Sequence, residues 1–366
     1  MKDEDLRVPL WIDRDDALRE LLRDAPASLG LDTEFMRIDT FLPRLALVQV
    51  ENAGRIALVD PTTGLAPAAL AEVLADPART IVMHSASEDL EALATWSCQL
   101  ANLFDTQVAA AFAGLGAGLG YQKLVSQITG IDLPKGETRS DWLRRPLSAD
   151  QLEYAAQDVV HLPTLHAELS ARVGARGYAT WLVEDCARML ERARNREPDA
   201  EPQLGYRGAA EWPRERQALL RRILRWRDAT ARETDRPRPW LLDDPRILDL
   251  ASRPPKDADD LAERTRGLRA LRHAQRAELL AVLNAPLAPE ELEFLPIPRA
   301  PDNAEKRTIA AMKEIVVKRA AELDLPDGLL CARRHLETLL ASRRWPQALE
   351  GWRRTVLHDA LVALLP

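Results

Sequence analysis

Two acidic residues on one short apolar run, Asp32 and Glu34 in LGLDTEF, place the strongest constraint on how this chain folds. The runs LALVQV and RIALVD follow closely, and short apolar runs of this kind are typical of β-strands. Side chains two positions apart on a strand project from the same side of a sheet. We therefore expect the two carboxylates to lie side by side at the end of a first strand.

Two later segments carry further acidic residues. Asp89 lies in HSASEDLEAL, within the first turn of the helix that is predicted after the apolar run IVMHS. Tyr154 and Asp158 in QLEYAAQDVVHL are four positions apart, so they should share one face of a helix. The capping-box residues Ser148 and Gln151 predict where that helix begins.

Four carboxylates gathered in one place repel one another and lose solvation, so the arrangement requires cations. Carboxylate oxygens are hard ligands, which suit Mg²⁺ or Mn²⁺ better than Zn²⁺. The pattern therefore predicts a divalent-metal site of the kind that cuts phosphodiester bonds. Its carboxylates belong to Asp32, Glu34, Asp89 and Asp158.

The motifs around these positions resemble those of the DEDDy group of 3′-to-5′ exonucleases, and within it the ribonuclease D family. The matching segments are LDTEFMR with FLPRLALVQ, then MHSASEDLEAL, NLFDTQVAA and SDWLRRPLSADQLEYAAQDVVHL. They occur in the expected order and cover most of residues 25–170.

The resemblance implies a catalytic role for five residues: Asp32, Glu34, Asp89, Tyr154 and Asp158. The four acids would hold two divalent cations, Mg²⁺ or Mn²⁺, and the tyrosine would position the attacking water. A phenol has an ordinary pKa of about 10, so Tyr154 suits orienting water better than acting as a strong base. The implied activity is release of nucleoside 5′-monophosphates from RNA with a free 3′ end, with tRNA precursors as the expected substrate.

Apolar runs at about 28–34, 45–50, 55–60, 80–85 and 101–105 predict strands with helices between and after them. This mixed α/β pattern resembles the ribonuclease H-like exonuclease fold and assigns residues 1–194 to a catalytic domain. A charged, breaker-rich linker is expected at 195–208. All-α helical domains are expected to follow it.

Two helical units, at 209–292 and 293–366, share a loose pattern of a long helix, a proline-bearing turn and a shorter helix. The first, especially LRWRDATARETDRPRPWLLDD, resembles the helical (HRDC) domain shared by the C-termini of RecQ helicases and ribonuclease D. The second resembles it through its spacing. The units either form a platform for structured RNA or serve only as packing modules.

Several residues near the acids are candidates for substrate contacts. Phe35 and Met36 would pack on a terminal base, and His84 would contact the scissile phosphate or the terminal ribose. Lys135, Arg139 and Arg145 would neutralise the incoming phosphates. Each has a simpler alternative: core packing for the first two, a structural histidine, and solvated loop charges for the cations.

A net charge of −7 is unusual for a nucleic-acid enzyme, but it divides into −11 over residues 1–190 and +4 over residues 191–366. An acidic catalytic part that needs metals and a mildly basic second part explain this division. The chain contains three widely separated cysteines, which form neither a disulfide framework nor metal-ligand spacing, as expected in a reducing cytoplasm. No apolar run approaches the ~18 residues of a membrane span, so no membrane partner is expected. A monomer is expected.

Two other classes stay open. A DNA exonuclease of the proofreading or repair type would use the same carboxylates, because nothing in the motifs identifies contacts to the 2′-hydroxyl. A non-catalytic RNA-binding scaffold would be favoured if a metal ligand were missing, and all four acids are present. The sequence leaves open the physiological RNA, the stopping point of trimming and the preferred cation.

Overall fold

The computed structural model describes residues 8–134, 140–195 and 197–365. The chain divides into two compact units. The first takes in the described residues of Met1–Met36, Pro43–Asn195 and Asn303–Pro366, and the second those of Arg37–Leu42 and Arg196–Asp302. The polypeptide therefore leaves the first unit and later returns to it.

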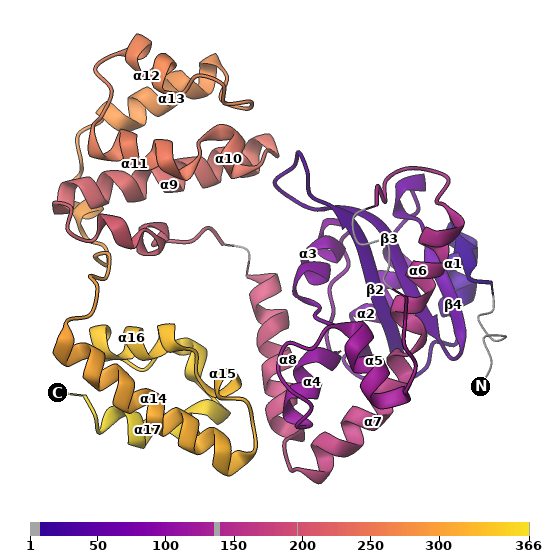
Figure 1. The fold of residues 1–366 in the computed structure, drawn as a ribbon. Helices are drawn as coiled ribbons and strands as arrows, with labels where there is room; N and C mark the ends of the chain where they lie inside the picture. The colour runs from indigo at the N-terminus through magenta and orange to yellow at the C-terminus, as the bar shows by residue number, and fades with distance from the viewer. Residues whose placement is uncertain (1–7, 135–139, 196, 366) are drawn as a thin grey trace. The chain divides into compact units, whose positions relative to one another are not determined.

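A six-stranded mixed sheet lies at the centre of the first unit, with strand order β1-β4-β3-β2-β5-β6 (Figure 1). The β2–β3 and β3–β4 pairs are antiparallel, and the other three neighbouring pairs are parallel. This confirms the predicted mixed α/β fold. The strands are β1 (Leu10–Ile12), β2 (Ser28–Met36), β3 (Arg44–Asn52), β4 (Arg55–Val59), β5 (Thr80–Met83) and β6 (Leu103–Asp105).

Five of these strands coincide with the apolar runs in the sequence, and β1 does not. Only Ile12 of its three residues is buried, whereas Leu10 and Trp11 are exposed at the sheet edge. Such a short edge strand carries too few buried side chains to produce a periodic pattern.

The helices of this part of the chain lie between the strands in sequence and continue after the last one. They are α1 (Asp15–Leu22), α2 (Ala68–Leu74), α3 (Ser87–Thr95), α4 (Thr106–Phe112), α5 (Tyr121–Thr129), α6 (Ala149–Val160), α7 (Leu162–Ala175) and α8 (Ala179–Arg194). The expected capping box begins α6: Ser148 Oγ accepts from Gln151 N at 3.2 Å, and Gln151 Oε1 accepts from Ser148 N at 2.9 Å. Helix α6 ends at Val160, soon after Asp158, and Pro163 sits in the first turn of α7, where a proline is tolerated.

The two faces of the sheet have different cores. Leu29, Leu31, Val48 and Val50 belong to the main hydrophobic cluster on one face. Leu47 and Leu58 project from the other face and pack with α6 residues, including Ala155 and Tyr154. Because side chains alternate along a strand, Asp32 and Glu34 of β2 face the same side as Leu47, toward α6.

Helical segments make up the rest of the chain. The second unit contains α9 (Arg214–Thr234), α10 (Arg238–Leu241), α11 (Asp244–Ser252), α12 (Ala258–Arg264) and α13 (His273–Asn284) around their own hydrophobic cluster. The expected linker at 195–208 contains a short 3₁₀ helix, Pro202–Gly205. The returning segment forms α14 (Asn303–Leu323), α15 (Asp327–Leu330), α16 (Arg333–Ser342) and α17 (Trp352–Val362).

The two helical segments repeat one another closely. Their first three helices begin at 214, 238 and 244 and at 303, 327 and 333, so each element recurs at the same spacing. Asp235 and Asp324, which follow the two long helices, both adopt a left-handed backbone conformation. The loose pattern seen in the sequence is therefore a regular structural repeat.

The returning helices pack on α8 within the first unit. The indole rings of Trp352 and Trp181 are stacked with centroids 4.5 Å apart and an angle of 8° between their planes. Arg353 donates to both carboxylate oxygens of Asp185, at 2.5 and 2.7 Å, and Trp352 Nε1 donates to the same carboxylate at 3.1 Å. Trp352 and Asp185 are buried, so the C-terminal helices share the core of the first unit.

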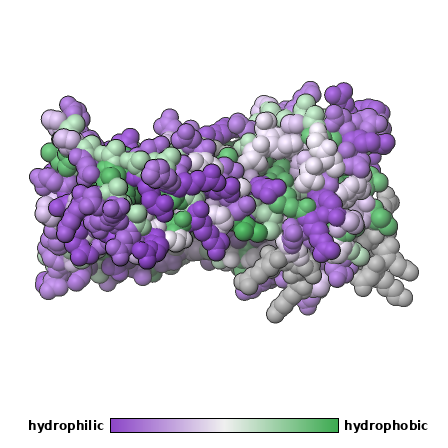
Figure 2. Space-filling view, turned by 90° about the horizontal axis from the view of Figure 1, so that it is seen from above, coloured by the Kyte–Doolittle hydropathy of each residue, from purple (hydrophilic) through white to green (hydrophobic). Residues whose placement is uncertain are grey.

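Polar and charged side chains cover most of the face seen in Figure 2, and hydrophobic residues form small patches among them. Among the described residues, no helix is both long enough and apolar enough to span a membrane.

Arg353→Ala should lower the free energy of unfolding of the first unit by about 3 kcal/mol, because the buried Asp185 carboxylate loses both arginine hydrogen bonds and keeps only the more distant Arg188, at 3.9 Å. Arg354→Ala removes the neighbouring ion pair between Arg354 and Glu350, in which the two side chains are 49% and 44% exposed. This change should lower the free energy of unfolding by less than about 1 kcal/mol. Urea denaturation followed by circular dichroism measures both. Equal effects would contradict the importance of the Asp185 contact.

Candidate active site

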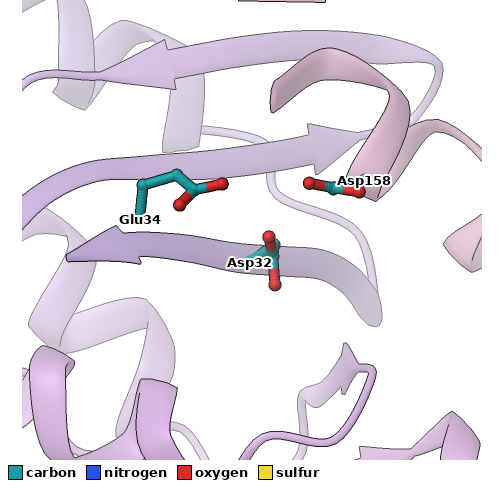
Figure 3. A group of neighbouring side chains, drawn as sticks. All are labelled: Asp32, Glu34 and Asp158. Atoms are coloured by element: carbon teal, nitrogen blue, oxygen red, sulfur yellow. The ribbon is translucent and has the colours of Figure 1, made fainter. Parts of the chain in front are cut away.

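Three carboxylates converge on the α6 side of the sheet. Asp32 and Glu34 project from β2, and Asp158 projects from α6 toward them (Figure 3). One carboxylate oxygen from each residue lies within 4.8 Å of the other two. The structure thus brings together three of the four acids that were singled out in the sequence.

The fourth acid, Asp89, lies in the first turn of α3 and is buried. Thr33, between Asp32 and Glu34 on β2, donates its hydroxyl to Asp89 Oδ1 at 2.5 Å. Asp105 at the end of β6 accepts from Ala86 N at 2.9 Å, which fixes the start of α3. Asp89 is outside the group of three, yet its charge raises the pKa of both Asp32 and Glu34.

Burial and mutual repulsion raise the pKa of all four acids above the ordinary value of a carboxyl group. Burial, followed by the charges of Asp158 and Asp89, raises the pKa of Glu34 to about 9. Burial is also the main cause that raises the pKa of Asp158 to about 7 and that of Asp89 to about 6. The pKa of Asp32 is raised well above its usual range by burial and by the other three acids. The four acids therefore hold their protons more strongly than free carboxylic acids unless cations are bound.

Tyr154 lies one helical turn before Asp158 and shares its face of α6. Its hydroxyl lies near the Asp158 carboxylate and favours the charged form of that acid, and its ring lies 6.0 Å from that of Trp142. Burial, followed by the Asp158 charge, raises the pKa of the phenol further above its ordinary value. Tyr154 therefore stays protonated and acts as a hydrogen-bond donor beside the acids.

The structure places the candidate substrate residues in different settings. Met36 packs in the cluster that contains Trp142, in agreement with the core alternative, and Phe35 is partly exposed where a bulge interrupts the β2–β3 pairing. His84 is partly buried, with Nδ1 2.9 Å from Thr106 Oγ1, and burial lowers the pKa of its ring. A neutral imidazole contributes no charge toward a phosphate.

Arg145 is occupied by structural contacts rather than free for substrate. Its guanidinium donates to both oxygens of Asp60, at 2.6 and 2.7 Å, to Ala46 O at 2.7 Å, and to Trp142 O and Arg144 O. These bonds use all five N–H groups of an arginine, so the expected phosphate contact is not supported by the structure. Lys135 and Arg139 lie outside the described residues.

Three residues that border the site were not singled out in the sequence. Thr33 holds Asp89, as described above. Tyr121 lies near Asp158 and Asp32, whose charges raise its pKa after the larger effect of burial. Gln49 is the direct cross-strand neighbour of Asp32 and is fully buried. Only the strand register reveals Gln49, because nothing in its local sequence distinguishes it from a surface glutamine.

The donor set fits hard divalent cations. All three converging groups offer carboxylate oxygens, and each remains partly exposed, so an ion can reach them from solvent. The raised pKa values of these acids point the same way: without cations the charged carboxylates are disfavoured, and bound cations would favour the charged form of each carboxylate.

Comparisons with known proteins agree with this geometry. Residues 9–173 match the family model for 3′-5′ exonuclease domains, and residues 216–282 match the HRDC domain. The chain is 44% identical to the ribonuclease D of Xanthomonas oryzae, over 98% of its own length and 99% of that protein. It is 31% identical to the ribonuclease D of Escherichia coli, over 97% of both proteins.

A solved structure shares the fold along nearly the whole chain. The crystal structure of Escherichia coli RNase D, described as an exoribonuclease involved in structured RNA processing, superposes with a TM-score of 0.81. The two chains are 29% identical, and the match covers 97% of this chain and 98% of the other.

In the absence of divalent cations, thermal stability should fall as the pH rises from about 5 to about 9. A carboxyl group whose pKa is raised by folding stabilises the fold below its unfolded pKa, and this contribution is lost as the pH passes the folded values of about 6, 7 and 9. Melting curves in EDTA across this range measure the effect, and added Mn²⁺ should remove most of it.

Asp158→Asn should raise the melting temperature of the metal-free protein at pH 8 because it removes one of the repelling charges. Asp150→Asn, at an exposed position in the first turn of the same helix, is the matched control and should bring no such gain. A wild-type protein without pH dependence, or an equal gain in the control, would contradict the electrostatic account.

Proposed function

Because the chain belongs to the ribonuclease D family of 3′-to-5′ exoribonucleases, we propose that it removes nucleotides from RNA 3′ ends at the acidic site between β2 and α6. The family membership confirms the resemblance seen in the sequence motifs. The activity itself, 3′-to-5′ exoribonuclease, follows from the relatives and the exonuclease domain. The number of cations, the products and the physiological RNA belong to the proposal.

The observation that carries the proposal is the convergence of Asp32, Glu34 and Asp158, with one oxygen of each within 4.8 Å of the others. A buried acidic group of this density is unfavourable by itself. We propose that these three residues and Asp89 hold two divalent cations, Mg²⁺ or Mn²⁺. When bound, such cations neutralise the acids and supply Lewis-acid activation of water and of the departing oxygen.

Tyr154 would orient the attacking water. Its hydroxyl lies near the Asp158 carboxylate, and the raised pKa of the phenol keeps the proton in place. A protonated phenol can hold a water by hydrogen bonding but does not remove its proton at neutral pH. Tyr154 is therefore proposed as an orienting group and not as a general base.

The reaction adds one water across the terminal phosphodiester bond. Water forms a new bond to phosphorus, the bond from phosphorus to the 3′ oxygen breaks, and that oxygen takes up a proton. Each cycle therefore releases one nucleoside 5′-monophosphate and leaves an RNA shorter by one nucleotide with a free 3′-hydroxyl.

Precursors of tRNA are the proposed substrates. The Escherichia coli relative is described as acting in structured RNA processing, and this chain carries a matching HRDC domain at 216–282. We propose that the HRDC domain holds the folded part of the RNA while its 3′ end is trimmed. The repeated helices α14–α16 are proposed as a second domain of this type.

We also propose that the enzyme acts as a monomer in the cytoplasm. All five residues assigned to catalysis come from a single chain, so no partner subunit is needed to complete them. Cys98, Cys186 and Cys331 are free and buried, which suits a reducing compartment.

Asp32→Ala should reduce release of mononucleotides by at least about 10³-fold while leaving RNA affinity within a few-fold, because the acid acts on catalysis more than on phosphate binding. Single-turnover digestion of end-labelled RNA and a filter-binding assay measure the two quantities. Asp150→Ala is the control and should cleave normally. If Asp32→Ala retains normal cleavage, the assignment of the site is wrong.

Digestion of a 3′-extended tRNA precursor, an unstructured RNA and a DNA of the same sequence should give mononucleotides from the RNA substrates in Mg²⁺ or Mn²⁺. We expect the precursor to be trimmed up to its folded stem and the unstructured RNA to be degraded further. Time courses on sequencing gels show the direction and the stopping point. Faster digestion of the DNA would favour a repair-type nuclease instead.

A further inference from the structure

Gln49 is the most unusual polar residue near the acidic site. It lies on β3 with 0% of its surface exposed, and neither Nε2 nor Oε1 has a hydrogen-bond partner among the described residues. A buried amide without hydrogen-bond partners is destabilising, because nothing compensates for the water that it loses on folding. The amide forms no hydrogen bond with the described residues of the metal-free protein, so it reaches a partner only through a local side-chain rearrangement such as cation binding would bring.

The strand register shows where that partner lies. Gln49 is paired with Asp32 across the antiparallel β2–β3 ladder and with Leu58 across β3–β4. Directly paired residues project from the same face, with Cβ atoms about 5 Å apart. Leu58 is apolar and packs in the cluster beneath α6, so Asp32 is the polar neighbour of Gln49 in this row.

The chemistry of the pair is complementary. An ionised carboxylate only accepts hydrogen bonds, and a glutamine amide offers two N–H donors and one acceptor. Asp32 is the acid surrounded by the other three, so it gains most from a donor that fixes its orientation. The amide oxygen then remains available to accept from a water in the same site.

We propose that Gln49 is a positioning residue, whose amide holds the Asp32 carboxylate in the orientation that binds a divalent cation. The inference rests on the proposed function, since it assigns Asp32 to a metal site. Residues that hydrogen-bond to metal ligands orient them, and their loss commonly weakens metal affinity by about 10- to 100-fold. Gln49 would act on the metal through Asp32, without touching the substrate.

Gln49→Met tests this role because it keeps the length of the side chain and removes the amide. Two effects of opposite sign are expected. Mn²⁺ affinity, measured by calorimetry on the full-length protein, should fall about tenfold. The melting temperature of the metal-free protein should rise by about 2–4 °C, because the amide without partners is gone.

Leu47→Met is the matched control, since Leu47 lies on the same strand and face and is paired with Glu34. A Leu-to-Met exchange changes packing but removes no polar group. It should leave Mn²⁺ affinity within about twofold of the wild-type value. If Gln49→Met does not fold, Gln49→Leu removes the same amide.

Three results would overturn the inference. Wild-type Mn²⁺ affinity in Gln49→Met would show that the amide does not orient a ligand. A lower melting temperature of the metal-free variant would show that Gln49 already serves the fold. Equal loss of Mn²⁺ affinity in Leu47→Met would assign the effect to packing.

Asp32→Asn, measured in the same titration, separates this inference from the proposed function. It should lose Mn²⁺ affinity whether or not Gln49 has the proposed role. If Asp32→Asn binds Mn²⁺ normally, the metal site itself is misassigned. If only Gln49→Met binds normally, the metal site stands and the role of Gln49 is wrong.

Discussion

Mutual repulsion among closely packed, largely desolvated carboxylates is the constraint on which the architecture of the catalytic unit depends. Asp32 and Glu34 are held side by side by β2, and Asp158 is brought opposite them by α6, whose start is fixed by a capping box. Asp89 is fixed separately, by the Thr33 hydroxyl. Each acid lies on a helix or a strand. The packing of these elements therefore offsets the unfavourable free energy of charge repulsion, which flexible loops could not do.

The part of the site that depends on spacing within one element could be predicted from the sequence. Residues two apart on a strand or four apart on a helix must share a face, which is why Asp32 with Glu34 and Tyr154 with Asp158 were found. Arg145 could not be placed in this way, because its partner Asp60 is distant in sequence. Gln49 depends on strand register, which local composition does not specify.

Stability and activity make opposite demands on this site. Burial and the gathered negative charge raise the pKa of the acids, which we expect to weaken the metal-free fold, and the same charge suits the site to cations. The same surroundings affect Tyr154. Burial and the neighbouring acids raise the pKa of its phenol, so the hydroxyl keeps its proton and can donate a hydrogen bond. The electrostatics thus set the role of each group before any substrate arrives.

The catalytic unit is discontinuous along the chain, since residues 303–366 return to pack on α8. During synthesis, all five residues assigned to catalysis leave the ribosome well before Trp352 and Arg353, which complete the contacts of Trp181 and Asp185. A nascent chain therefore carries the full set of acids while one side of its core is still open. Completion of the core waits for helices α14–α17, so the nuclease reaches full stability only after these helices have been translated.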